Sequence, residues 1–378
     1  MICFVCTFII KSMITENPVP QANKQQRFKH VDSLRGIAAL LVIWLHVSES
    51  FIKLSNNKST LIYDMSWYIN TGRVGVVIFF AISGFVLLNS IIGMKSFLIK
   101  RFLRLYPAFW LSIICGIFVL QDQFPSPSTL LANITMVPLM FDKGVIIGVY
   151  WTLESELIFY FIGLILFLFG VSRNPFMVFL MSMAFVLIFI VLLLTKFTAP
   201  NHTGLNVMPY HLAIMFWGGL YRHFYNQPKA LVRVFKYSLS VKFILIILTI
   251  MVFAIPLASL IKGALLSEFK SIQFGLANLI GLTMFIVLTG YFKIKNGFMV
   301  WLGTISYSMY LFHPIIFSAV LWWFNNFALS TLNQMNLVTY LILNLFLTIV
   351  FSSIVYILIE KPSMNLASKI IYKKINSY

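Results

Sequence analysis

The chain has 378 residues and a formal net charge of +18, yet only 10% of its residues are charged and 60% are hydrophobic. A soluble domain carries about 25% charged residues, and a soluble core of this length could not bury so much apolar surface. The composition therefore excludes an ordinary soluble enzyme and predicts an integral membrane protein.

Apolar segments of roughly membrane-spanning length recur along the chain. They lie at about 33–52, 70–92, 105–121, 148–169, 174–195, 208–224, 241–261, 272–290, 301–324 and 337–359. The segment 208–224 is short and the weakest, and the apolar stretch 130–140 could instead form a surface or re-entrant helix. We predict an all-α integral membrane protein with about ten transmembrane helices: a cytoplasmic N-terminal segment at 1–30, a transmembrane domain at 31–360 and a short basic tail at 361–378.

Basic residues in short loops indicate the orientation of the spans. With the N-terminus inside, 21 of the 28 Lys and Arg residues fall on the cytoplasmic side, so both termini are expected there. The positive charge is then explained by topology and by contact with membrane lipids. Nucleic acid is not an expected partner, because the basic residues are spread over six segments without a recognition module.

The cysteines do not indicate a metal site, and the N-terminal residues do not indicate a signal peptide. Cys3, Cys6 and Cys115 lack the spacing of a metal site, and no metal is expected. The first fourteen residues are apolar but have neither a basic leader nor a small-residue cleavage site, so they do not predict a signal peptide. Met13, which precedes a polar segment, is an alternative start to Met1.

The first span contains a cation and an imidazole on one helical face. Arg35 and His46 are eleven positions apart, about three helical turns, with no ionisable side chain between them. They are thus expected about 16 Å apart along the helix axis. A charge within a membrane helix predicts function, and His46 can take up and return a proton near neutral pH.

A second basic pair follows span two. Arg101 and Arg104 are three residues apart and share one side of a helical turn at the cytoplasmic face. Alone, the pair is typical of a stop-transfer anchor. Beside Arg35, however, three guanidinium groups would form a site suited to phosphate oxygens. Both interpretations remain open.

Later spans add carboxylates and a second histidine. Glu154 and Glu156 are two residues apart and cannot face one cavity, whereas Glu156 and Tyr160 are four apart and can. Glu156 either neutralises a basic residue or takes part in catalysis. His313 precedes a proline, a pattern that is more typical of a hydrogen-bonded helix kink than of a proton carrier. Helical rise nevertheless predicts similar depths for His46, His313 and Glu156.

These segments together resemble the membrane-bound acyltransferase 3 family of integral-membrane acyltransferases. The matching stretches, in family order, are Asp32-Ser33-Leu34-Arg35-Gly36 with His46, Ser83-Gly84-Phe85, Lys100-Arg101-Phe102-Leu103-Arg104-Leu105-Tyr106-Pro107, Trp151-Thr152-Leu153 with Glu156, Phe159 and Tyr160, Ser306-Tyr307-Ser308-Met309-Tyr310-Leu311-Phe312-His313-Pro314, and Glu360-Lys361-Pro362. The resemblance implies a multi-pass enzyme of the bacterial inner membrane. Such an enzyme moves an acyl group, often acetyl, from cytoplasmic acyl-coenzyme A to a hydroxyl of an envelope glycan.

The resemblance also implies roles for the residues singled out above. His46 would be the general base and Glu156 its orienting or charge-balancing partner, while Arg35, Arg101 and Arg104 would hold the donor. Asp32, Ser83, Trp151, Tyr160 and His313 would support them. Acetyl-coenzyme A or another acyl-coenzyme A would be the donor substrate, and no permanently bound cofactor is expected. Glu154 departs from the family pattern, which more often has a small polar residue there.

Several alternatives remain open at this stage. The acceptor can be a lipopolysaccharide O-antigen, a capsule or other exopolysaccharide, peptidoglycan, a lipid-linked saccharide, or a small-molecule or lipid hydroxyl. The absence of an appended hydrolase-like domain favours a stand-alone enzyme. An acyl-histidine intermediate is an alternative to direct transfer. A secondary transporter would also place ionisable residues at the midplane, but the sequence lacks the paired broken helices typical of one. A non-enzymatic structural or assembly factor would not need Arg35 and His46 on one face of a membrane helix.

Overall fold

The computed structural model describes residues 28–54, 61–120, 124–195, 203–234 and 236–375. The N-terminal segment up to residue 27, with the alternative start at Met13, lies outside the described residues. The prediction of an all-α protein is confirmed, because the structure is 85% helical. Nine helices in the described ranges are long and apolar enough to cross a membrane.

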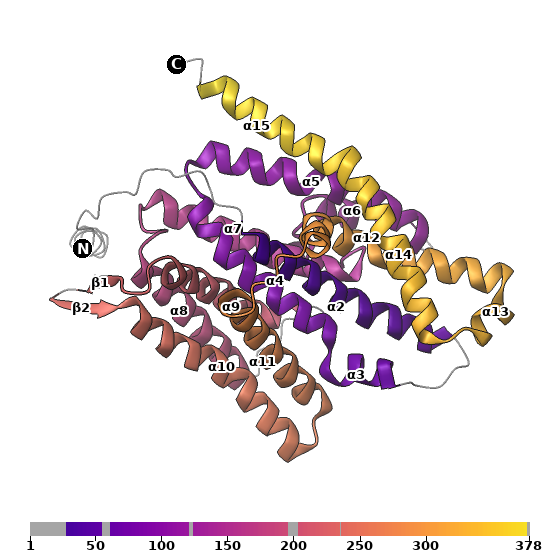
Figure 1. The fold of residues 1–378 in the computed structure, drawn as a ribbon, viewed down its shortest axis with the longest axis horizontal. Helices are drawn as coiled ribbons and strands as arrows, with labels where there is room; N and C mark the ends of the chain where they lie inside the picture. The colour runs from indigo at the N-terminus through magenta and orange to yellow at the C-terminus, as the bar shows by residue number, and fades with distance from the viewer. Residues whose placement is uncertain (1–27, 55–60, 121–123, 196–202, 235, 376–378) are drawn as a thin grey trace.

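The helices run mostly along one direction, and a short hairpin lies at one end of the bundle (Figure 1). In chain order the helices and strands are α2 (Lys29–Leu54), α3 (Leu61–Ile69), α4 (Thr71–Leu87), η1 (Leu88–Ser90), α5 (Met94–Leu120), α6 (Pro127–Ile134), η2 (Pro138–Phe141), η3 (Gly148–Tyr150), α7 (Trp151–Leu168), α8 (Pro175–Leu194), α9 (Thr203–Asn226), β1 (Leu231–Val234), β2 (Tyr237–Ser240), α10 (Val241–Leu266), α11 (Phe269–Gly290), α12 (Gly297–Phe327), α13 (Leu329–Gln334), α14 (Leu337–Val355), η4 (Tyr356–Glu360) and α15 (Lys361–Ile375). The strands pair antiparallel, with Leu231 opposite Ser240.

Two segments with ambiguous sequence patterns are resolved by the structure. The stretch 130–140 does not span; it forms the short helices α6 and η2. The weak segment 208–224 is part of α9, which is not among the nine long apolar helices. Phe216 and Trp217 of α9 are fully buried by neighbouring helices. Because these side chains are buried, α9 is an internal helix of the bundle. Polar residues such as His211 and Arg222 lower its mean hydropathy.

Small residues allow the central helix α4 to approach its neighbours closely. α4 packs against α2, α7, α9 and α11. A Cβ atom added at Gly84 would lie 1.7 Å from the carbonyl oxygen of Met215 in α9, and one added at Gly75 would lie 2.4 Å from that of Ala38 in α2. Glycine is therefore required at both positions, since any side chain would force the helices apart.

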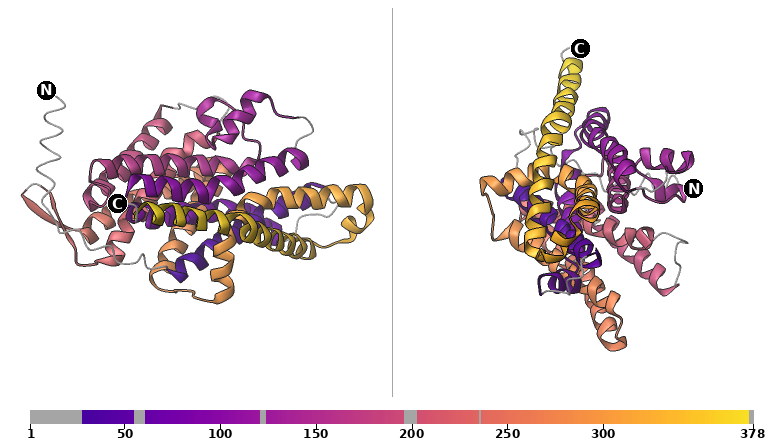
Figure 2. Two further views of the ribbon diagram at one scale, coloured as in Figure 1. Left: turned by 90° about the horizontal axis from the view of Figure 1, so that it is seen from above. Right: turned by 90° about the vertical axis from the view of Figure 1, so that its right-hand side faces the viewer.

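The outer helices leave apolar side chains exposed, as expected where a protein meets lipid. On α8, Leu187, Val191 and Leu194 are exposed, and on α10, Ile250 and Leu265 are exposed. Residues 361–375 of the expected short basic tail are helical: η4 continues α14 into α15, which packs beside α5 and projects from the bundle (Figures 1 and 2).

Candidate functional site

Two cavities lie inside the bundle among the described residues. One has a volume of about 90 Å³ and is lined by Arg35, Arg101, Arg104, Ser83, Glu156 and Tyr160, among others; we call it the arginine cavity. The other has a volume of about 570 Å³ and is lined by His46, Glu49, Asn70, Arg73, Trp151 and Phe317, among others; we call it the histidine cavity.

The two cavities adjoin, because Val76 of α4 and Tyr310 of α12 line both. α2 and α4 pass the two cavities in opposite directions. Along α2 the arginine cavity receives Arg35 and the histidine cavity His46, and along α4 the order is reversed from Arg73 to Ser83. The eleven-residue step from Arg35 to His46, about 16 Å of helical rise, therefore leads from one cavity to the other.

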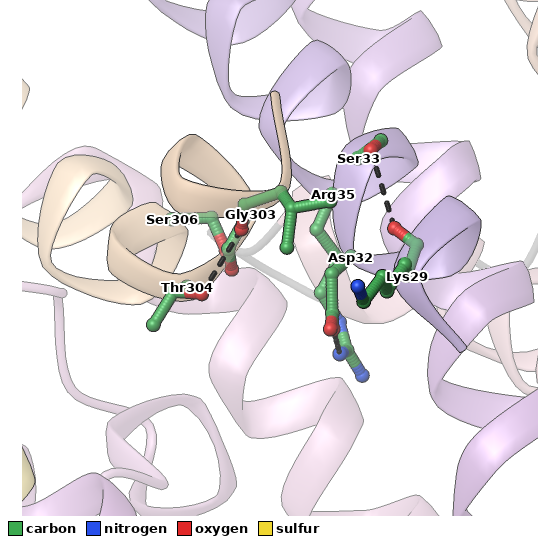
Figure 3. Close-up of polar contacts among 8 residues, drawn as sticks. Lys29, Asp32, Ser33, Arg35, Gly303, Thr304 and Ser306 are labelled. Atoms are coloured by element: carbon green, nitrogen blue, oxygen red, sulfur yellow. Dashed lines mark hydrogen bonds and ion pairs between the residues drawn. The ribbon is translucent and has the colours of Figure 1, made fainter. Parts of the chain in front are cut away.

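An ion pair on α2 fixes the first arginine. The carboxylate Oδ1 of Asp32 accepts a hydrogen bond from Nη1 of Arg35 at 3.0 Å. Beside this pair, α12 approaches α2 so closely that a Cβ added at Gly303 would lie 1.7 Å from the carbonyl oxygen of Asp32 (Figure 3). Ser306 donates a hydrogen bond to the carbonyl of Gly303 and lines the arginine cavity. The close crossing thus places α12 residues next to the Asp32–Arg35 pair.

The second arginine belongs to a chain of hydrogen bonds across three helices. Nη1 of Arg101 donates to the Tyr160 hydroxyl at 3.2 Å, and its guanidinium also lies 4.7 Å from the centroid of the Tyr160 ring. The Tyr160 hydroxyl donates to Oε1 of Glu156, which accepts a second hydrogen bond from the Ser83 hydroxyl at 2.9 Å. The expected pairing of Glu156 with Tyr160 is present, and this pairing orients Arg101.

The two histidines meet in the bundle. The imidazole rings of His46 and His313 are stacked, with centroids 5.4 Å apart and an interplanar angle of 28°. His313 is fully buried, and its Nδ1 is 3.1 Å from the carbonyl oxygen of Met309. This contact matches the hydrogen-bonded histidine expected before a proline, and the ring stack additionally limits the orientations that His46 can adopt.

The carboxylate beside His46 is Glu49, not Glu156. Oε2 of Glu49 lies 3.8 Å from Nδ1 of His46, one turn further along α2. Glu156 lines the arginine cavity, and its hydrogen bonds are with Ser83 and Tyr160. The structure therefore does not place Glu156 as the partner of His46. Similar depth alone does not bring two side chains together, because it leaves open the direction in which each side chain points from its helix.

Aromatic and hydroxyl groups occupy the boundary between the cavities. The Tyr310 hydroxyl lies 2.7 Å from the Thr152 hydroxyl and donates to the carbonyl of Val149 at 3.0 Å. Trp151 lines the histidine cavity, and its ring centroid is 5.3 Å from that of the buried His211. These contacts tie the start of α7 to α12 and α9, and they fix Tyr310 at the junction of the cavities.

Glu154, which departs from the family pattern, has a structural position. It is fully buried, and its two carboxylate oxygens accept hydrogen bonds from the backbone amides of Leu139 and Met140 at 3.1 and 2.8 Å. The carboxylate thereby holds η2 against α7. It lines neither of the two cavities.

Two cavity residues were missed in the sequence. Glu49 is three positions after His46 and so shares its helical face, but it lies near the end of the predicted span. Arg73, at the start of span two, is one of the basic residues by which the spans are oriented. For Glu49 the i, i+3 spacing was a usable signal; for Arg73 the sequence gives no indication that it lines a cavity.

Comparison with known proteins identifies the family. No curated protein and no solved structure matches the chain significantly. A family model described as an acyltransferase domain matches residues 28–357, which include every residue that lines the two cavities. The expected resemblance is thus confirmed over nearly the whole chain. The chain belongs to the acyltransferase 3 family, and we conclude that it is a membrane acyltransferase.

Proposed function

We propose that this protein transfers an acyl group, acetyl in the simplest case, from cytoplasmic acyl-coenzyme A across a bacterial inner membrane to a hydroxyl of an envelope glycan. The observation that carries the proposal is the pair of adjoining cavities, one with three guanidinium groups and the other with an imidazole. In a transfer across the membrane the donor and the acceptor enter from opposite sides, so each substrate needs its own cavity next to the other.

The arginine cavity suits the donor. Coenzyme A carries phosphates, and guanidinium groups match phosphate oxygens with paired hydrogen bonds. Arg35 and Arg101 are held by Asp32 and Tyr160, so the donor would bind to groups that are already oriented. Glu156 acts here as the group that orients Arg101 through Tyr160. The thin pantetheine arm then carries the thioester past Tyr310 into the histidine cavity.

His46 performs the proton transfers. Its imidazole takes the proton of the acceptor hydroxyl while the oxygen attacks the thioester carbonyl. The tetrahedral intermediate expels the coenzyme A sulfur, which takes the proton back from the imidazolium. The products are the acyl ester and free coenzyme A. Glu49 stabilises the imidazolium between the two proton transfers, as the third group does in hydrolytic triads.

The proposal is tested in sealed vesicles of defined orientation that contain the purified protein and a lipid-linked glycan. Acetyl-coenzyme A supplied to the face that bears the C-terminus should acetylate glycan exposed on the opposite face. Mass spectrometry detects the product as an alkali-labile acetyl group. His46→Ala should lose transfer by about 10²–10⁴-fold while the protein still inserts, because the substitution removes the proton carrier and makes the helix more apolar.

Three results would contradict the proposal. Equal transfer with donor on either face would exclude a through-membrane reaction. Substantial turnover by well-folded His46→Ala would exclude His46 as the base. Envelope glycans without any labile substituent, in a comparison of a deletion strain with its complement, would favour the small-molecule, lipid or transporter alternatives.

A further inference from the structure

The histidine cavity contains a cation that the proposed reaction does not use. Arg73, at the start of α4, is half-buried and lines this cavity together with His46. A cation in a membrane-spanning helix is unfavourable unless it is paired or functional. The charge of Arg73 therefore needs an explanation in terms of what the cavity binds.

Within the described ranges, the ion pairs are Arg35 with Asp32, His46 with Glu49, and Lys262 with Glu268. None of them includes Arg73. Its guanidinium carbon lies 5.1 Å from the centroid of the Phe274 ring, a cation–π contact that leaves the in-plane N–H groups available. The backbone N–H of Arg73 is satisfied separately by the side chain of Asn70 at 3.0 Å. The guanidinium is thus oriented by an aromatic ring rather than neutralised by a carboxylate.

Arg73 and His46 lie at the same level of the bundle. A Cβ added at Gly72 would lie 2.8 Å from Cδ2 of Leu45, so these two residues face each other where α4 meets α2. Arg73 and His46 are the next residues on each helix, and both line the cavity. Glu49 also lines the cavity, and its carboxylate is 3.8 Å from His46. Among the described residues, the carboxylate of this cavity thus lies beside His46, and no carboxylate lies within ion-pair distance of Arg73.

We propose that Arg73 binds an anionic group of the acceptor, so that the histidine cavity accepts a sugar that carries a carboxylate or a phosphate as well as the hydroxyl to be acylated. A guanidinium group presents parallel N–H donors that fit either anion. An anion bound at Arg73 places a neighbouring hydroxyl at the level of His46. Arg73 is then a specificity-determining residue for the acceptor. This inference rests on the proposed function, because it names the chemical class of that acceptor.

The test measures binding, so that it does not depend on turnover. Purified protein in detergent, saturated with coenzyme A to occupy the arginine cavity, is titrated by calorimetry with glucose, glucuronate and glucose 1-phosphate. The wild type should bind at least one of the two anionic probes about tenfold more tightly than glucose. Comparison of glucuronate with glucose 1-phosphate distinguishes a carboxylate from a phosphate.

Arg73→Gln should abolish this preference and leave the affinity for coenzyme A unchanged, which also reports that the variant is folded. Arg73→Lys, which keeps the charge but not the parallel donors, should retain part of the preference. Lys262→Gln is the matched control, since it removes an exposed basic residue that lines neither cavity, and it should behave as the wild type.

The inference is overturned if the wild type does not distinguish the anionic probes from glucose, or if the preference survives in Arg73→Gln. A variant that loses turnover equally with anionic and neutral acceptors, without any change in binding, would assign Arg73 to stabilisation of the reaction intermediate instead. Charge-dependent binding without any acyl transfer would retain the anion site and refute the proposed function.

Discussion

Nδ1 of His46 and Oε2 of Glu49 lie 3.8 Å apart on one face of α2. The distance is that of an ion pair rather than of a hydrogen bond. The two side chains are 35% and 21% exposed, so solvent screens the interaction and limits it to about 1 kcal/mol. Glu49 therefore positions and stabilises His46 without being indispensable.

Glu49→Gln should lower kcat by about fivefold, which corresponds to about 1 kcal/mol, with the KM for acetyl-coenzyme A unchanged. Glu49→Asp keeps the charge and should recover part of the loss. Release of free coenzyme A, followed with a thiol reagent, gives both constants. A rise in the donor KM without a fall in kcat would show that Glu49 does not act through His46.

Loss of a guanidinium from the arginine cavity should affect the donor alone. Arg101→Gln and Arg104→Gln should each raise the KM for acetyl-coenzyme A by about tenfold or more, because a hydrogen bond to a charged group contributes about 1.5–3 kcal/mol. The acceptor KM should stay the same. Lys100→Gln is the matched control, as Lys100 is exposed and lines neither cavity. An effect confined to acceptor affinity would refute the assignment of this cavity.

The parts of the site that depend on spacing along one helix could be predicted from the sequence. The common face of Arg35 and His46 and the pairing of Glu156 with Tyr160 follow from 3.6 residues per turn, and both are present. Helical rise also predicted similar depths for His46 and His313, whose rings are stacked. The relationships along one helix do not depend on where the spans end.

The separation of Glu156 from His46 could not be predicted in the same way. Glu156 lies on another helix, and its contacts depend on how α7 packs against α4, where the Ser83 hydroxyl donates to Glu156. That Arg73 and His46 line one cavity depends on how α4 packs against α2, where Gly72 lies against Leu45. Contacts between helices of this kind are set by packing and have no periodic signal in a single sequence.

Glu154 should matter for stability rather than for chemistry. Glu154→Ala leaves the buried amide of Leu139 and the partly buried amide of Met140 without their acceptor, and an unsatisfied buried group costs about 1–3 kcal/mol. The unfolding temperature in detergent should fall, while kcat per folded molecule stays near the wild-type value. Glu268→Gln, which alters an exposed ion pair, should change the unfolding temperature much less. A selective loss of kcat in Glu154→Ala would instead indicate a catalytic role.

The crossing of α2 and α12 should be intolerant of a single methyl group. In Gly303→Ala the new Cβ would lie 1.7 Å from the carbonyl oxygen of Asp32, a backbone atom that cannot rotate away. The helices would have to separate at the Asp32–Arg35 pair. Overpacking typically costs about 1–3 kcal/mol, so we expect a lower unfolding temperature together with a higher KM for acetyl-coenzyme A.

Gly297→Ala is the control for this substitution, because it lies in the first turn of the same helix and a Cβ there meets no atom within 4 Å. Alanine also favours helix formation over glycine by about 1 kcal/mol, so the control should be neutral or stabilising. Equal unfolding temperatures for Gly303→Ala and Gly297→Ala would mean that α2 and α12 are not in backbone contact. Arg35 of α2 and Ser306 of α12, which both line the arginine cavity, would then not be brought together by this crossing.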